Sequence, residues 1–153
     1  MALPACGLYR TTQPLASIPA SRLVYFHNHG NPGAGLYLPS GWTLNRAAWN
    51  TNGNPLGPAD DASTLEPLAV EGLYTVREAF FCCEKRCVRF EPAQLVQLGY
   101  DAEASPILFT PEWTASGLRF PERGTRLDLT ELGKLGLLRV AQGREISADG
   151  FIH

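Results

Sequence analysis

Short apolar runs separated by turns rich in glycine and proline dominate the pattern of this chain. In the run 22–28, alternate residues lie on opposite faces of an extended strand, and both faces are largely apolar, as in a strand at the centre of a sheet. Few stretches show the spacing of an amphipathic helix. The pattern therefore predicts an all-β protein built from many short strands and tight turns.

One segment near the end of the chain departs from this strand pattern. Asp128 and Glu131 place acidic residues at the start of a stretch that Gly136 would end. Acidic side chains at the first turn are favoured by the helix dipole, and Asp is a common N-cap. We therefore expect a short helix near residues 129–135.

Rare residues of the first half of the chain recur in the second half, in the same order and with nearly constant spacing. The matched residues are 7–9 and 72–74, Leu23 and Leu95, Leu36 and Leu108, Pro39 and Pro111, Trp42 and Trp113, Trp49 and Phe120, and a closing Leu-x-x-Leu at Leu65/Leu68 and Leu132/Leu135. Such self-similarity indicates two copies of one structural unit. The second copy is longer ahead of Leu95, which places an insertion within residues 80–90.

The repeat predicts a division of the chain into two tandem β-modules, 1–70 and 71–140, followed by a tail, 141–153. Short strands in units of this size are typical of small SH3-like β-barrels, although a single β-sandwich of the whole chain would satisfy the same pattern. Units this small have little core of their own. We therefore expect them to pack against each other.

Composition narrows the classes of partner. The 153 residues are 44% hydrophobic and 18% charged, with a formal net charge of −2, so no general electrostatic attraction to nucleic acid or to an anionic membrane is expected. No apolar run approaches the roughly 20 residues that span a bilayer, and the N-terminus lacks the features of a secretory signal. These features favour a cytoplasmic protein, in which thiols are usually reduced.

Three cysteines in the second copy, Cys82, Cys83 and Cys87, form the densest chemical signal. If residues 84–86 form a hairpin loop, Cys83 and Cys87 become cross-strand neighbours, and two thiolates could share a zinc ion. Strand alternation would send Cys82 to the opposite face. The remaining ligands would have to come from elsewhere: Cys6, His27, His29 or His153. Reduced structural cysteines, a Cys83–Cys87 disulfide and a redox role are the alternatives to a metal site.

Matched aromatic residues offer a second candidate site. Tyr37 and Trp42 of the first copy correspond to Phe109 and Trp113 of the second. One interpretation is packing in the core or between the modules; the other is a paired aromatic groove that binds a partner, as small barrels often do.

Catalytic signatures do not stand out in the sequence. It contains no nucleophile elbow, phosphate loop or dinucleotide fingerprint. We therefore expect a non-enzymatic interaction or assembly protein, without a cofactor, that binds a protein partner or itself. The alternative hypothesis is a zinc-dependent or thiol-dependent protein centred on Cys83 and Cys87.

Overall fold

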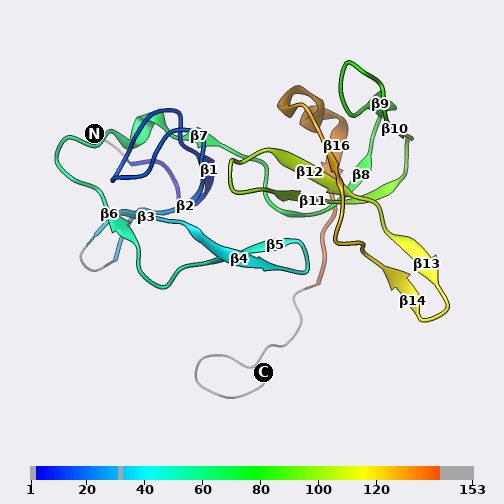
Figure 1. Ribbon diagram of the computed structural model, residues 1–153, viewed down its shortest axis with the longest axis horizontal. Coiled ribbons are helices and arrows are strands. Elements are labelled where there is room, and N and C mark those ends of the chain that lie inside the picture. The colour runs from blue at the N-terminus through cyan, green and yellow to red at the C-terminus, as the bar shows by residue number, and fades with distance from the viewer. Residues whose placement is uncertain (1–2, 31–32, 142–153) are drawn as a thin grey trace.

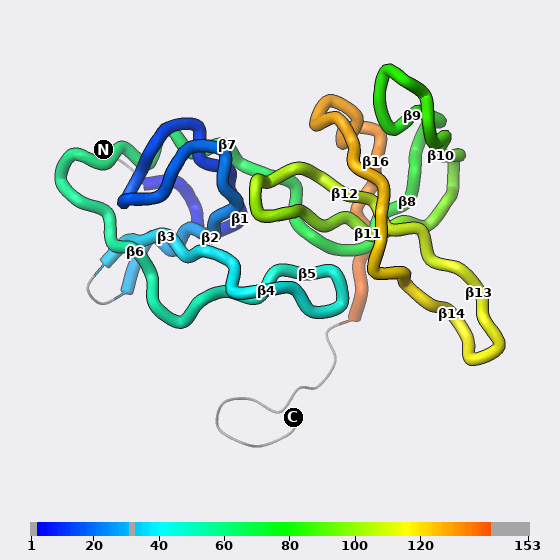
Figure 2. Tube along the Cα trace, viewed as in Figure 1, coloured from blue at the N-terminus to red at the C-terminus, as the bar shows by residue number. Residues whose placement is uncertain are grey.

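The computed structural model describes residues 3–30 and 33–141, and its main features are two five-stranded antiparallel sheets (Figures 1 and 2). The first sheet has the strand order β6-β3-β2-β1-β7, and the second has the order β15-β12-β11-β8-β16. The strands of the first are β1 (Gly7–Arg10), β2 (Leu23–His27), β3 (Gly35–Tyr37), β6 (Asn54–Pro55) and β7 (Glu66–Pro67). Those of the second are β8 (Gly72–Val76), β11 (Leu95–Tyr100), β12 (Pro106–Phe109), β15 (Thr125–Arg126) and β16 (Leu135–Leu137).

Three two-stranded hairpins extend from these sheets. Hairpin β4–β5 joins β3 to β6, and hairpin β13–β14 joins β12 to β15. The third hairpin, β9–β10, lies between β8 and β11; the corresponding link between β1 and β2 contains an isolated antiparallel bridge between Leu15 and Ile18. The bounds are β4 (Pro39–Thr43), β5 (Arg46–Trp49), β9 (Phe80–Phe81), β10 (Arg89–Phe90), β13 (Glu112–Thr114) and β14 (Gly117–Arg119).

The prediction of a mainly β protein is confirmed, but the barrel part of the prediction is not. Within residues 3–30 and 33–141, neither sheet closes on itself, so the SH3-like barrels expected from strand count are not seen. Strand count and unit length are the same for an open sheet and a small barrel, which is why the sequence pattern could not separate them. The boundaries at 70/71 and 140/141 stay predictions, and most of the predicted tail lies outside the described residues.

The two sheets correspond strand by strand and also in register. Tyr9 pairs with Val24 as Tyr74 pairs with Val96. In the hairpins, Trp42 pairs with Ala47 and Trp113 pairs with Leu118 at matching positions. Register depends on which side chains face the core, because a slip of one residue turns every side chain to the opposite face. The matched apolar residues therefore occupy equivalent positions in the two sheets.

One part of the sequence alignment is wrong. Glu66 pairs with Arg10 in the first sheet, and Gly136 pairs with Thr75 in the second, so Leu65 corresponds to Leu135 rather than to Leu132. The predicted short helix is present as a 3₁₀ helix, η2 (Leu129–Lys134), and its extra length accounts for the shift. The first half has only the shorter η1 (Ala62–Thr64) at this place.

Each sheet has its own cluster of buried apolar side chains, which fits two modules better than the single core of a sandwich. The first cluster includes Phe26 and Leu36, and the second includes Phe90, Leu98 and Tyr100. The second cluster also takes up side chains from the first half of the chain: Leu8, Leu23, Ala47, Trp49 and Leu68. The two halves therefore pack against each other, as expected for units too small to be stable alone.

Candidate functional site

Hairpin β4–β5 belongs to the first half of the chain but docks on the second sheet. Its Trp42 donates a hydrogen bond from Nε1 to the backbone oxygen of Tyr100 over 2.8 Å. Its Ala47 backbone N–H donates to the carboxylate of Glu71 over 3.0 Å. Ala47 and Trp49 pack on the second apolar cluster. The hairpin thus holds the two halves together through both polar and apolar contacts.

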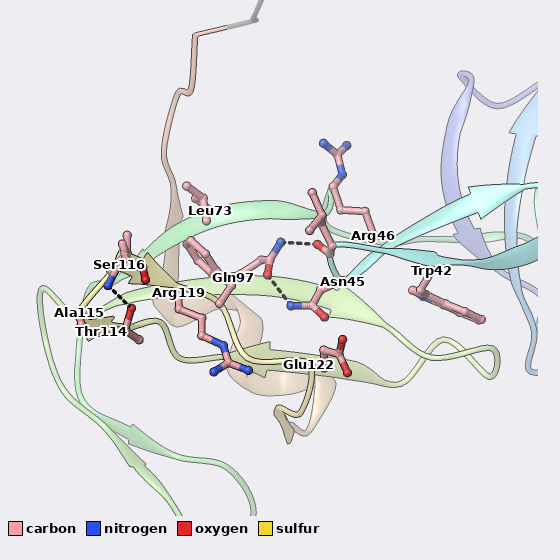
Figure 3. Close-up of a pocket in the computed structure, with 13 residues that line it drawn as sticks. Trp42, Asn45, Arg46, Leu73, Gln97, Thr114, Ala115, Ser116, Arg119 and Glu122 are labelled. Atoms are coloured by element: carbon pink, nitrogen blue, oxygen red, sulfur yellow. Dashed lines mark hydrogen bonds between the residues drawn. The ribbon is translucent and has the colours of Figure 1, made fainter.

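The tip of this hairpin meets the central strand β11 (Figure 3). The Asn45 side-chain amide donates to Gln97 Oε1 over 2.9 Å and to the backbone oxygen of Pro121 over 3.0 Å. The Gln97 amide in turn donates to the backbone oxygen of Leu44 over 3.0 Å. Gln97 is a buried polar residue, so these bonds satisfy groups whose burial would otherwise be unfavourable.

A glycine of β11 makes this close approach feasible. A Cβ atom placed on Gly99 would lie 2.7 Å from the backbone oxygen of Asn45 and 3.2 Å from the ring of Phe109. The residue at the corresponding position of the first sheet is His27, because His27 pairs with Gly35 as Gly99 pairs with Ile107. The second sheet is therefore shaped to receive a hairpin at this point.

Hairpin β13–β14 occupies the corresponding place in the second half but leaves its apolar side chains in solvent. Trp113 is 81% exposed, whereas its counterpart Trp42 is 43% exposed. Leu118, the cross-strand partner of Trp113, is 45% exposed. Figures 1 and 2 show this hairpin projecting from the end of the molecule opposite the first sheet. The hairpin therefore carries an aromatic and an aliphatic side chain that the described part of the chain leaves largely exposed.

An open cavity of about 1260 Å³ separates the tips of the docked and the free hairpins (Figure 3). Leu44 and Asn45 line one side, while Ser116, Leu118 and Arg119 line the other. The wall mixes apolar side chains with the charged groups of Arg46, Arg119 and Glu122 and the hydroxyl groups of Thr114 and Ser116.

Trp42 lines a second cavity, and the first sheet has a cavity at the corresponding place. The Trp42 cavity is about 380 Å³ and is lined by Ile107, Phe109 and Arg126, among others. The cavity on the first sheet is about 560 Å³ and is lined by Gly35, Tyr37 and Pro55. Strand pairing shows that these three residues correspond to Ile107, Phe109 and Arg126. None of the described residues lining the first-sheet cavity is a tryptophan.

Hairpin β9–β10 ends in a loop that gathers three cysteines. The ligand atoms of Cys82, Cys83 and Cys87 all lie within 4.8 Å of one another, and the sulfurs of Cys82 and Cys83 are 3.6 Å apart. All three are free thiols. The expectation that Cys82 faces away is wrong, because β9 ends at Phe81 and strand alternation does not extend to Cys82.

Hydrogen bonds to the backbone and to sulfur set the chemistry of this loop. The backbone N–H of Val88 donates to Cys82 Sγ over 3.3 Å. The neighbouring Cys82 thiol, together with the backbone N–H groups of Lys85 and Cys87, holds the pKa of Cys83 below its usual value. The negative charge of the Cys83 thiolate raises the pKa of Cys87. Cys83 should thus ionise before Cys87.

The histidine candidates belong to a separate group. Cys6, His27 and His29 have ligand atoms within 4.8 Å of one another, and the described residues place neither histidine in the group of Cys82, Cys83 and Cys87. Asn28 occupies the centre of the histidine group: its Oδ1 lies 3.2 Å from Cys6 Sγ and 2.8 Å from His29 Nδ1. His153 lies outside the described residues.

The four predicted aromatic residues divide into buried and surface positions. Phe109 is buried in the core, and Tyr37 lies beneath Gly53 at the rim of the first-sheet cavity. Trp42 packs between the two halves, and Trp113 is exposed. The sequence analysis did not identify Gln97, Gly99 and Glu71, which form the surface that hairpin β4–β5 contacts. These residue types become informative only once the hairpin is known to lie across β11.

Comparison with protein-family models, with curated proteins and with solved structures found no match. In the described part of the chain, no helix has the length and apolar character needed to cross a bilayer. The function is therefore inferred from the geometry of the hairpins, the cavities and the cysteine loop.

Proposed function

We propose that this protein is a non-enzymatic assembly protein that associates head to tail through hairpin β13–β14. The observation that carries the proposal is the contrast between two corresponding hairpins: β4–β5 docks on the second sheet, whereas β13–β14 has its Trp113 81% exposed among the described residues. The correspondence of the two sheets further suggests that they arose by duplication of one β-module.

The partner that binds the free hairpin would be a second copy of this chain. The cavity on the first sheet corresponds to the cavity that Trp42 lines beside Ile107 and Phe109, and it is itself lined by Tyr37, His27 and His29. An indole ring placed there would contact aromatic rings, which favours the burial of Trp113. Strands β3 and β6, which contribute to the lining of this cavity, lie at the opposite end of the molecule from hairpin β13–β14 (Figure 1), so the contact would form between copies and not within one copy.

The geometry of this contact would differ in one respect from that of the docked hairpin. His27 stands where Gly99 allows the close approach of Asn45, so the hairpin of a second copy would lie further from β2 than β4–β5 lies from β11. The tip of the free hairpin is smaller, with Ala115 and Ser116 in place of Leu44 and Asn45. A contact between different surfaces on the two copies is heterologous and builds a ring or an open chain.

Light scattering coupled to size exclusion tests this proposal. The wild-type chain, of 16.7 kDa, is expected to show a mass that increases with concentration. Trp113→Ala should weaken association about 30-fold or more, as for an aromatic anchor at an interface. Val140→Ala, which truncates another exposed apolar side chain (57% exposed), is the matched control and should associate like the wild type.

A complementation experiment distinguishes head-to-tail association from any other kind. Thr51 lines the first-sheet cavity and is exposed, so Thr51→Arg should block the cavity without disturbing the core. Trp113→Ala and Thr51→Arg should each be monomeric, and their mixture should form a dimer that grows no further. A wild-type monomer at every concentration, or a mixture that stays monomeric, would refute the proposal.

A further inference from the structure

We propose that Cys82, Cys83 and Cys87 bind one zinc ion through three thiolates, with the fourth position open to a water molecule. This site is separate from the hairpin contact and does not depend on it. The first observation is geometric: three ligand atoms converge within 4.8 Å of one another on a single short loop. Tetrahedral zinc, with Zn–S bonds of about 2.3 Å, places its sulfurs about 3.8 Å apart. The spacing of 3.6 Å between the sulfurs of Cys82 and Cys83 is close to that value.

The loop holds the cysteines in place without the ion. The backbone N–H of Cys82 donates to the backbone oxygen of Val88 over 2.9 Å. The backbone N–H of Arg86 donates to the backbone oxygen of Cys83 over 3.0 Å, which closes the turn that carries the cysteines. Arg86 has φ 55°, a left-handed conformation that is unfavourable for a residue with a side chain and persists where the surroundings enforce it. Below the loop, the rings of Phe80 and Phe90 stack 5.1 Å apart. The thiols therefore converge on a rigid base.

The sulfur environment suits a bound thiolate. The N–H of Val88 points at Cys82 Sγ, and hydrogen bonds of this kind stabilise the charged form of the acceptor. Three thiolates around Zn²⁺ leave one net negative charge. The guanidinium groups of Arg86 and Arg89 lie over the ring of Phe81, 5.1 and 5.5 Å from its centroid, and place positive charge beside the loop. Binding would release the thiol protons to solvent and form three Zn–S bonds.

Soft thiolate ligands select zinc over calcium and magnesium, which prefer oxygen. Cys82 is buried, Cys83 is half-buried and Cys87 is exposed, so the open side of the site faces solvent. A water there completes the tetrahedron. The other candidate group, Cys6 with His27 and His29, is a weaker site, because the side chain of Asn28 already bonds to Cys6 and His29.

Alkylation of the wild-type protein tests the site without any substitution. In a metal-free sample kept reduced with a phosphine, Zn²⁺ should slow the alkylation of Cys82, Cys83 and Cys87 about tenfold or more, since the bound thiolate is no longer free to react. Cys6 should react at the same rate with and without zinc. Peptide mapping would assign each rate. The proposal would be overturned if zinc left the alkylation rates of the three loop cysteines unchanged, or if it protected Cys6 alone.

Cobalt titration then measures stoichiometry and ligand type. Co²⁺ should bind at one equivalent per chain and give the thiolate charge-transfer and visible bands of a tetrahedral site, and Zn²⁺ should displace it. Cys87→Ser should lose this spectrum, and Cys6→Ser, the matched control, should keep it. A spectrum that survives in Cys87→Ser, or its absence in the wild type, would overturn the assignment. Far-UV circular dichroism of each variant confirms that the loss is not due to unfolding.

Discussion

Hairpins β4–β5 and β13–β14 occupy the same place in two corresponding sheets, yet one is docked and the other is free. The difference does not lie in the hairpins' own pairing, since Trp42 faces Ala47 as Trp113 faces Leu118. It lies in the surface that each can reach. β4–β5 meets Gln97, Gly99 and Glu71, whereas β13–β14 points away from both sheets. The hairpin that holds the two halves together in the first half thus has a counterpart in the second half whose apolar side chains are exposed.

The largest expected difference between the two hairpins is in the effect of truncating their tryptophans. Trp42→Ala should lower the free energy of unfolding by about 2 kcal/mol, because it removes half-buried apolar surface and the hydrogen bond to Tyr100. Trp113→Ala should change it by less than about 0.5 kcal/mol in the monomer, as for an exposed residue. Urea unfolding at low protein concentration measures both values. Equal losses would show that the free hairpin also has an intrachain role.

A comparable effect is expected from filling the space on β11 that allows the docked hairpin to approach. Gly99→Ala would bring a Cβ to 2.7 Å from the Asn45 backbone oxygen, which cannot rotate away. We expect a loss of about 1–3 kcal/mol in the free energy of unfolding, the usual cost of overpacking. Gly41→Ala, in strand β4 of the docked hairpin, is the matched control, since its added Cβ meets nothing within 4 Å. A neutral Gly99→Ala would mean that the hairpin is not held against β11.

The sequence predicted the correspondence of the two halves because tryptophan and proline are rare enough for their spacing to be informative. The link that the sequence predicted to be longer contains the hairpin β9–β10. Neither result required knowledge of side-chain direction. The prediction for Cys82 did require it and was wrong, because the strand ends one residue earlier than alternation assumed.

The docking of one hairpin could not be predicted from the sequence. Trp42 and Trp113 are the same residue type in the same local pattern, and their exposure is set by where the rest of the chain lies. Glycine at position 99 is a signal only after β4–β5 is known to cross β11. Closure of a sheet into a barrel likewise depends on twist and register across strands that are distant in sequence. These tertiary features decide whether a matched residue is packed within the chain or exposed on its surface.

The smallest expected effect concerns Glu71, whose carboxylate accepts the Ala47 N–H of the docked hairpin over 3.0 Å. Burial raises the pKa of Glu71 above its usual value of 4.5, although the Ala47 hydrogen bond and the charge of Arg46 oppose this. The folded state therefore binds more protons than the unfolded state just above pH 4.5, and stability should fall as pH rises through the folded pKa. Glu71→Gln should remove this dependence and stabilise the protein at neutral pH by less than about 0.5 kcal/mol, since part of the carboxylate is in solvent. Urea unfolding from pH 4 to pH 8 measures the change, with Glu112→Gln on the free hairpin as control. The same pH-dependent gain in both variants would assign the effect to net charge and not to the contact that fixes β4–β5.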